Sequence, residues 1–358
     1  MSRVYNTIGS LTTIKDHLVK NNIYDFKSLK EVIDFKNSYV SKRNEILAQS
    51  KDLILKEKGQ LTAELNELDA VVSRHKTEVE RKLNLEIEDL VEEKLKLASG
   101  SSTQIFAKLW DKFRQTELQR EIDRKRRNFN EIVNSSLAGF AAELQIKRNR
   151  QRFIEANFEA AVHERAQMSL FELDRKKMAI NEIGSFIPGA LGEQQVVKTL
   201  EVLPDNCHLI NDFSVSFSKA IYYSQGNDYI KTIQIDHILI TPAGVFIIET
   251  KNWSEKSINN LDLRSPVQQI KRSSFALFVL MHDSGLSLNL HHWGDKKIPI
   301  KNLIVMIHSK PNAEFQFIKI LTLNELPGYV KYFNPIFSDT EVQYITDHLN
   351  YLNGKEMV

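Results

Sequence analysis

The chain is poor in the features that mark secreted, disulfide-linked or membrane proteins. Its 358 residues include a single cysteine, Cys207, which excludes an intrachain disulfide framework and fits a reducing compartment. The longest uninterrupted apolar run, residues 275–281, is far shorter than the roughly 20 residues that cross a bilayer. Since the N-terminus also has no apolar signal-peptide core, we expect a cytoplasmic protein that does not enter a membrane.

Proline and glycine are scarce in the N-terminal half, which favours long helices. Residues 41–97 contain no proline and one glycine, Gly59. Apolar residues recur there at spacings that are mostly three, four or seven, with charged residues between them, as in a coiled coil. The expected seam consists of Leu61, Leu65, Leu68, Val72, Val79, Leu83, Ile87, Leu90 and Leu97.

A second helical stretch follows a short polar interruption at residues 98–102. Residues 103–180 contain no proline and only Gly139, so we expect the two helices to fold back as an antiparallel hairpin with its turn near 98–103. The same seam would also serve parallel pairing between chains, so the sequence leaves the oligomeric state open. The second-arm residues expected to face the first arm are Ile105, Leu109, Phe113, Ile132, Leu137, Phe140, Leu144, Phe158 and Val162.

Positive charge is concentrated on this second arm. Residues 101–180 carry 16 Lys and Arg against 11 Asp and Glu, whereas the whole chain has a net charge of only +2. Such a stripe can track a phosphate backbone, but we favour a solvated helix face paired with acids of the opposing arm. The stripe consists of Arg120, Arg124, Lys125, Arg126, Arg127, Lys147, Arg148, Arg150 and Arg152.

Two β-rich runs in the C-terminal half predict a hairpin. Residues 232–240 and 245–251 are rich in β-branched residues, and the Thr-Pro-Ala-Gly sequence at 241–244 has turn chemistry. Both runs are apolar on both faces, as in strands buried on two sides. A tight turn pairs Ile240 with Val245 across the two strands.

This register brings three charged side chains together. Asp236 then lies directly opposite Glu249, with β-carbons roughly 4.5–5.5 Å apart, and Lys251 returns to the same face two residues further on. Two such carboxylates repel unless a cation lies between them, and two oxygen ligands suit Mg²⁺. Lys251 would then orient or deprotonate an attacking water, or neutralise charge on phosphorus. A surface hairpin with an ordinary acid–lysine pair is the alternative, and the spacing alone does not decide between them.

Four short motifs occur in order in the C-terminal half. They are Gly-Ala-Leu-Gly-Glu at 189–193, Ile-Asp-His at 235–237, Gly-Val-Phe-Ile-Ile-Glu-Thr-Lys-Asn-Trp at 244–253 and Ser-Pro-Val-Gln-Gln at 265–269. Together they resemble the nuclease-related domain, NERD, itself similar to the PD-(D/E)xK nuclease superfamily, over about residues 189–326. Serine replaces the asparagine that begins the family's last element, at Ser265.

The resemblance assigns roles to five residues. Asp236 and Glu249 resemble the metal-binding acids, and Lys251 resembles the catalytic lysine. Glu193 resembles the helix-borne acid before the sheet, and Gln269 the glutamine that ends the last element. Considered alone, Glu193 is better explained as an acid at a helix N-terminus and Gln269 as a solvated helix residue. The cofactor implied is Mg²⁺ or Mn²⁺.

These observations predict an α+β protein in four parts. We expect a short helical cap at 1–26, an antiparallel coiled-coil hairpin at 27–180, a linker at 181–190 and a nuclease-like domain at 191–358. The last is expected to be an α/β, restriction-endonuclease-like domain with a mixed central sheet.

The function that follows from the resemblance is metal-dependent cleavage of nucleic acid. We expect DNA as the substrate, in DNA processing, repair or defence of a bacterium against foreign DNA. The coiled coil would mediate self-association or docking of a protein partner. Two alternatives remain open, a catalytically inactive nucleic-acid-binding module and a structural coiled-coil scaffold.

Overall fold

The computed structural model describes residues 1–99, 105–253, 264–286, 288 and 297–357. The chain forms two compact units. One comprises Met1–Asn37 together with Arg175–Val358, and the other is Ser38–Asp174. The first is a mixed β-sheet with helices on both faces, whereas the second is helical.

The sheet unit is built on seven strands in the order β1-β2-β3-β4-β5-β6, with β7 also paired to β2. The β2–β3 and β3–β4 pairs are antiparallel, and the β1–β2, β2–β7, β4–β5 and β5–β6 pairs are parallel. The expected α+β fold with a mixed sheet is therefore confirmed. The strands are β1 (Arg3–Tyr5), β2 (His208–Tyr223), β3 (Asp228–Thr241), β4 (Gly244–Lys251), β5 (Ile300–Met306), β6 (Ile318–Thr322) and β7 (Glu356–Met357).

Two hydrophobic cores cover the two faces of this sheet. Helices α7 (Arg264–Asp283) and α9 (Asp339–Leu352) contribute to one core, and α5 (Phe186–Leu200) and α8 (Leu326–Lys331) to the other. Alternate residues of one strand enter opposite cores, because side chains alternate along a strand. Ile238 and Ile240 belong to the α7–α9 core, while Leu239 belongs to the α5–α8 core.

The N-terminal residues contribute to the sheet unit rather than forming only a separate cap. Strand β1 pairs with β2, with Arg3 opposite His208, and helix α1 (Gly9–Lys20) packs against α5. The segment expected to be a linker, 181–190, contains the end of α4 (Phe158–Glu182) and the start of α5. Sequence analysis missed β1 because three residues carry no measurable periodicity.

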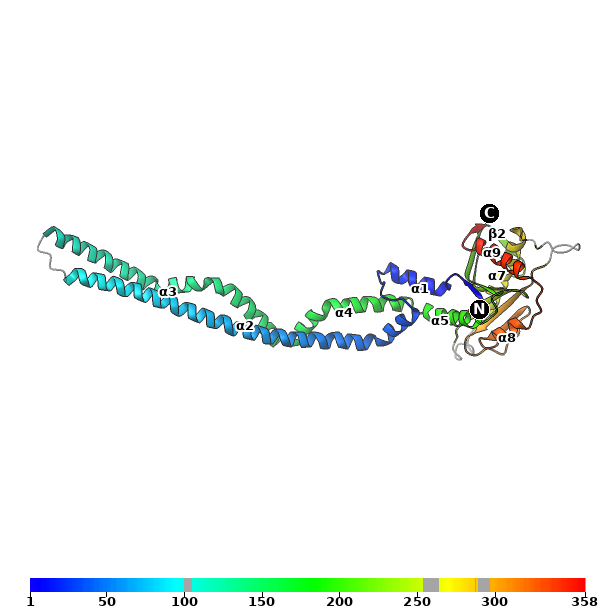
Figure 1. Ribbon diagram of the computed structural model, residues 1–358, viewed down its shortest axis with the longest axis horizontal. Helices are drawn as coiled ribbons and strands as arrows, with labels where there is room; N and C mark the ends of the chain where they lie inside the picture. Colours follow the sequence, from blue (N-terminus) through cyan, green and yellow to red (C-terminus); the bar gives the residue numbers. More distant parts are fainter. Residues whose placement is uncertain (100–104, 254–263, 287, 289–296, 358) are drawn as a thin grey trace. The chain divides into compact units, whose positions relative to one another are not determined.

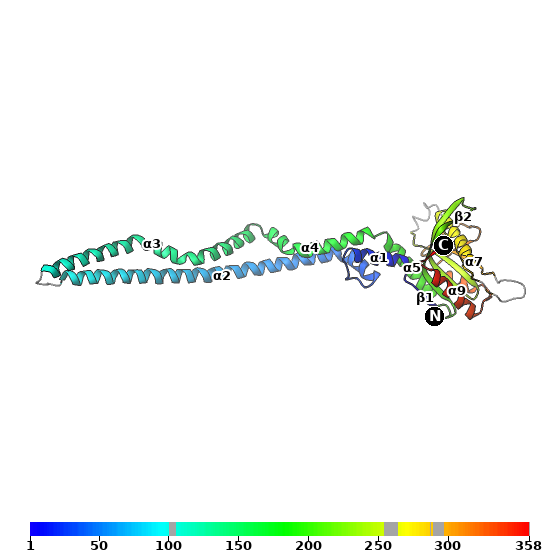
Figure 2. The ribbon, with the colours of Figure 1, turned by 90° about the horizontal axis from the view of Figure 1, so that it is seen from above.

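The second unit contains most of a helical hairpin. Helices α2 (Leu29–Ser99) and α3 (Ile105–Ala156) run side by side in both ribbon views (Figures 1 and 2). The expected seam positions on α2 are buried or half-buried, which confirms the coiled-coil pattern. The turn expected near 98–103 lies mostly outside the described residues. No helix in the described part of the chain is long and apolar enough to cross a membrane.

The expected contacts of the second arm are partly wrong. Leu109, Phe113 and Ile132 are 62%, 56% and 37% exposed, and the side chain of Ile105 lies outside the described residues. Leu118, Ile122, Val133 and Ile154 are instead the buried residues of α3. The apolar spacing is irregular over the first part of this arm, so the prediction chose exposed residues there, whereas Leu137, Phe140, Leu144 and Phe158 are half-buried and Val162 is buried as expected.

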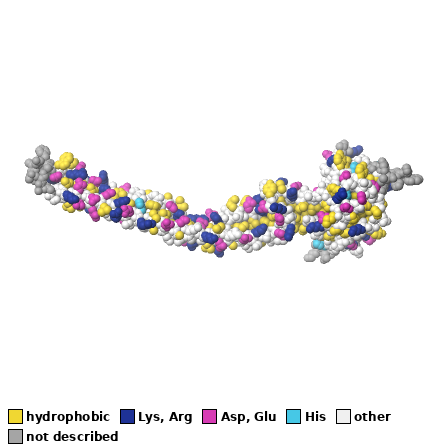
Figure 3. Space-filling view, viewed as in Figure 1, with side chains coloured by type: hydrophobic (Ala, Val, Ile, Leu, Met, Phe, Trp, Pro, Cys, Tyr) yellow, Lys and Arg dark blue, Asp and Glu magenta, His cyan; other side chains and the backbone are white. Residues whose placement is uncertain are grey.

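Many basic residues of the second arm are paired with acids of the first arm, as favoured from the sequence. Lys125 pairs with Glu86 at 2.6 Å, and Lys147 pairs with Glu64 at 2.5 Å. Arg148 pairs with Asp69 at 2.7 Å. Figure 3 shows side chains of both signs mixed along the helices rather than a continuous basic surface.

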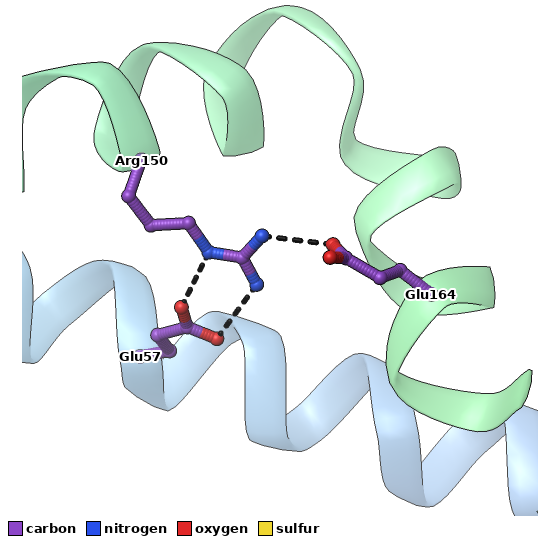
Figure 4. Close-up of polar contacts among 3 residues, drawn as sticks. All are labelled: Glu57, Arg150 and Glu164. Carbon is purple, nitrogen blue, oxygen red and sulfur yellow. Dashed lines mark hydrogen bonds and ion pairs between the residues drawn. The ribbon is translucent and has the colours of Figure 1, made fainter. Parts of the chain in front are cut away.

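Arg150 joins all three helices of the hairpin. Its guanidinium donates to both oxygens of Glu57 on α2, at 2.7 and 3.3 Å, and to Glu164 on α4 at 2.8 Å (Figure 4). The contacts lie around Asn157, where α3 ends and α4 begins. A small core that includes Ile54 and Ile154 packs in the same region. Arg150 therefore fixes α3 and α4 to α2 across the helix break.

Replacing Arg150 with methionine should destabilise this junction. We expect the free energy of unfolding to fall by about 1 kcal/mol, the upper end for partly exposed ion pairs. The reason is that the bidentate ion pair with Glu57 and the ion pair with Glu164 are lost together. Amide exchange at residues 150–165 should rise. Arg152→Met is the matched control, since Arg152 is exposed and has no ion pair among the described residues. Equal effects of the two substitutions would contradict the role assigned to Arg150.

Candidate active site

The β3–β4 hairpin positions the central residues of the site. Ile240 pairs with Val245, as predicted, and Thr241 pairs with Gly244. The Thr241 hydroxyl accepts a hydrogen bond from the Ala243 N–H at 3.1 Å, which closes the turn. Gly244 has a φ of +123°, and a β-carbon there would lie 2.7 Å from the Pro299 carbonyl oxygen. The turn chemistry thus sets the register of everything beyond it.

Glu249 and Lys251 lie at alternate positions of β4 that face the α7 side of the sheet, since Glu249 is two residues from Ile247 of the α7–α9 core. Asp236 lies on β3 between Ile235 and His237, and its charge interacts with those of Glu249 and Lys251. The two acids lie one position beyond the paired residues His237 and Ile248.

Glu249 is the most enclosed of these groups. It is 4% exposed, and both of its carboxylate oxygens accept hydrogen bonds. The Lys251 ammonium donates to Oε1 at 2.6 Å, and the Gln269 side-chain amide, from the first turns of α7, donates to Oε2 at 3.1 Å. A single carboxylate therefore holds two of the other predicted site residues in place.

Asp236 is half-buried and bonded to the neighbouring strand. Its Oδ2 accepts a hydrogen bond from the Thr250 N–H at 2.8 Å. A backbone N–H orients the carboxylate without neutralising it. Asp236 also lines an open pocket, so its remaining oxygen positions can meet a ligand.

Glu193 reaches the site from helix α5. A β-carbon on the preceding residue, Gly192, would lie 3.0 Å from the Asn252 β-carbon and 3.1 Å from Ile307, so glycine allows α5 to approach β4 closely. Glu193 is 7% exposed. The Ser10 hydroxyl of α1 donates to its Oε1 at 2.5 Å, and the Ser10 N–H is 3.5 Å from Oε2.

Several of these side chains line a polar pocket of about 270 Å³, whereas Glu249 and Lys251 do not belong to its lining. Two of its acids, Glu193 and Asp236, were expected from the sequence, and so was Gln269. The third acid of the pocket, Asp212 of β2, was not expected. It accepts a hydrogen bond from Gln234 at 2.8 Å. The pocket is lined by Gly9, Ser10, Thr13, Phe186, Glu193, Asp212, Gln234, Asp236 and Gln269.

Burial and mutual repulsion raise the pKa values of the acids. Burial, with repulsion from Glu249, raises the pKa of Asp236 to about 7. Burial also raises the pKa of Glu193 to about 7, although the Ser10 hydrogen bonds oppose the shift. For Glu249 burial again raises the pKa, against the lowering effect of Lys251. Carboxyls so perturbed within one cleft are typical of functional sites.

His237, in the same motif as Asp236, does not share this pocket. It is fully buried, its Nδ1 lies 2.7 Å from the Asn211 side-chain oxygen, and burial lowers its pKa to about 3. A neutral, fully buried histidine outside the pocket lining is a structural group.

Two residues of the pocket could not be found by motif reasoning. Ser10 precedes Glu193 by 183 residues, and no spacing rule joins them. Asp212 had a weak signal, because Asn211 and Asp212 interrupt an otherwise apolar run, and Asp212 has a φ of +48°.

The donor set is made of hard oxygen ligands, which fit Mg²⁺ or Mn²⁺ rather than a softer metal. No cluster of three or more histidine, cysteine, aspartate or glutamate side chains within the described residues has metal-binding geometry. The arrangement therefore fits a cation held by two carboxylates and completed by water and substrate oxygens.

The raised pKa of Asp236 gives a testable pH dependence. Between its ordinary value of 3.8 and about 7, the folded chain keeps a proton that the unfolded chain has lost, so this group makes stability fall as pH rises. In metal-free protein, the substitution Asp236→Asn should remove this loss of stability at high pH and should keep the hydrogen bond from the Thr250 N–H. Relative to wild type, we expect it to be more stable by on the order of 1 kcal/mol or more at about pH 8, and equal at about pH 4.

Denaturant unfolding in chelator measures this difference, with Asp205→Asn, an exposed acid of the same unit, as the control. A constant offset between Asp236→Asn and wild type at every pH would contradict the raised pKa.

Comparison with known proteins agrees with the sequence motifs. Residues 188–307 match the family model of the nuclease-related domain. No curated protein and no solved structure matches the chain. The match includes Glu193, Asp236, Glu249, Lys251 and Gln269. Residues 188–307 are therefore similar to the nuclease-related domain, and they follow a helical region consistent with a coiled coil.

Proposed function

We propose that this protein is a metal-dependent nuclease that hydrolyses phosphodiester bonds, with DNA as its substrate. One observation carries the proposal. The Asp236 carboxylate lines an open polar pocket and is close enough to Glu249 for their charges to interact, and Glu249 is bonded to Lys251. Burying two acids close together is unfavourable unless a cation or a proton compensates their charge. Two such acids beside a cleft are therefore typical of a functional site.

Asp236 and Glu249 are the residues that would hold Mg²⁺ or Mn²⁺. A bound divalent cation supplies a Lewis acid that polarises a phosphoryl oxygen and acidifies a bound water. The Thr250 N–H and the Gln269 amide fix the directions of the two carboxylates without adding charge.

Lys251 and Glu193 would act on the reacting groups. The Lys251 ammonium, 2.6 Å from Glu249, is placed to orient the attacking water or to neutralise charge on the phosphoryl group. Glu193 lies across the pocket and has a raised pKa, so near neutral pH it can exchange a proton with water.

The helical hairpin would serve self-association or docking of a protein partner. It leaves large apolar side chains exposed on α3, including Leu109, Trp110 (73% exposed), Phe113 and Ile146 (69%). The biological role would be DNA processing, repair, or defence against foreign DNA. Survival of a deletion strain under DNA damage and phage challenge measures that role, and unchanged survival in both would reject it.

A catalytically inactive nucleic-acid-binding module is the second candidate. One observation favours it: the Lys251 ammonium, 2.6 Å from Glu249, already compensates the charge of one of the two proposed ligand carboxylates without a metal. The two candidates differ in whether metal produces cleavage.

Incubation with Mg²⁺ or Mn²⁺ tests cleavage of single-stranded, double-stranded and branched DNA, with RNA in parallel. Removing a group that stabilises developing charge typically costs about 100- to 1000-fold, so we expect Asp236→Ala and Lys251→Ala to lose at least about 100-fold in rate. Lys319→Ala, an exposed lysine of β6, and Asp205→Ala are matched controls that should retain wild-type rates.

Near-ultraviolet circular dichroism should show that the inactive variants remain folded. Undiminished cleavage by Asp236→Ala or Lys251→Ala would remove the site assignment. Metal-independent binding without cleavage by the wild type would favour the inactive module.

A further inference from the structure

Ser10 is the residue outside the nuclease-related domain that makes the closest contact with a predicted site acid. Its hydroxyl donates to Glu193 Oε1 at 2.5 Å, and its N–H lies 3.5 Å from Oε2. Ser10 therefore contacts both oxygens of the Glu193 carboxylate. Residues 188–307 match the domain model, so this contact comes from a segment about 180 residues earlier in the chain.

The position of Ser10 in α1 suits this contact. It is the second residue of the helix, where backbone N–H groups have no partner within the helix and the helix dipole favours a carboxylate. Gly9 also lines the pocket. A β-carbon at this position would lie only 2.6 Å from the Asp212 carboxylate, so glycine lets the start of α1 approach that acid closely. On the other side, Gly189 of α5 leaves room, since its β-carbon would lie 3.3 Å from the Ser10 hydroxyl.

The segment that carries Ser10 is fixed to the sheet unit independently of this bond. The Arg3 N–H donates to the Cys207 carbonyl at 3.0 Å, and the Asn211 amide donates to the Asn6 carbonyl at 3.1 Å. Ile14 and Leu18 of α1 are buried. Ser10 therefore stands on an anchored helix, and the serine hydroxyl can orient Glu193 without having to hold α1 in place.

We propose that Ser10 is a positioning residue of the nuclease site, which holds the Glu193 carboxylate toward the pocket that it shares with Asp236. The inference rests on the proposed function and adds a component that the domain motifs do not contain. It also makes the site depend on both ends of the chain: Ser10 precedes the helical hairpin unit at 38–174, and Glu193 follows it.

Ser10→Ala tests the proposal in the full-length chain. Loss of an outer partner of a metal site typically costs about 10- to 100-fold in activity or metal affinity. Glu193 shares the pocket with the proposed ligand Asp236, so we expect kcat on DNA to fall by at least about 10-fold with KM unchanged. Mn²⁺ affinity, measured by calorimetry without DNA, should weaken by roughly the same factor. Ser10→Thr keeps the hydroxyl and should restore both quantities to within about twofold.

Thr12→Ala is the matched control. The Thr12 hydroxyl belongs to the same helical turn but is bonded to the Ile8 carbonyl and the Thr7 hydroxyl, outside the pocket lining. This variant should match the wild type in kcat and Mn²⁺ affinity. An equal loss in Ser10→Ala, Ser10→Thr and Thr12→Ala would show a purely structural effect of α1 and overturn the proposal.

The outcomes separate the two levels of inference. If the wild type cleaves and Asp236→Ala does not, but Ser10→Ala has wild-type kcat and Mn²⁺ affinity, the positioning role alone is rejected. If the wild type neither cleaves nucleic acid nor binds Mn²⁺, the proposed function fails and the role of Ser10 fails with it.

Discussion

The central constraint on this structure is the repulsion among carboxylates that the fold places in and beside one pocket. Glu193, Asp212, Asp236 and Glu249 influence one another electrostatically, and the Lys251 ammonium contacts Glu249. Burial makes the charged form of each acid expensive, since water no longer solvates it. The rest of the local structure can be understood as the means by which the chain keeps these acids in place despite that cost.

The strands and helices around the pocket share this task. The tight turn at 241–244 sets the hairpin register, and the register places Asp236 and Glu249 one position beyond the last paired residues. Helix α7 brings Gln269 to Glu249. Close packing at Gly192 brings α5, and with it Glu193, to the end of the sheet. Each acid is therefore held by a different secondary-structure element, and the two cores on either side of the sheet keep those elements rigid.

The features that could be predicted from the sequence are those that join residues close together along the chain. The hairpin register followed from a short turn, and the first-arm seam followed from local periodicity, because both are short-range patterns. The second arm was predicted less well, since Leu109 and Phe113 are exposed where burial was expected. Ser10 was not predictable, because its contact with Glu193 joins residues far apart in sequence and requires β1 and α1 to be placed first. The resemblance to a family identified the acids but could not reveal a group supplied from outside the matched region.

The choice of hydrogen-bond donors around the acids bears on the proposed chemistry. Three of the contacts come from neutral groups: the Ser10 hydroxyl, the Thr250 N–H and the Gln269 amide. Neutral donors orient a carboxylate and leave its charge uncancelled, whereas arginine or lysine at those positions would compete with a bound cation. The pocket therefore stays electronegative once its acids ionise. With the pKa values of Glu193 and Asp236 raised to about 7, binding of a divalent cation would displace protons and relieve the repulsion that raised them. In the proposed reaction, relief of the repulsion between the acids would be one source of the affinity for a divalent cation.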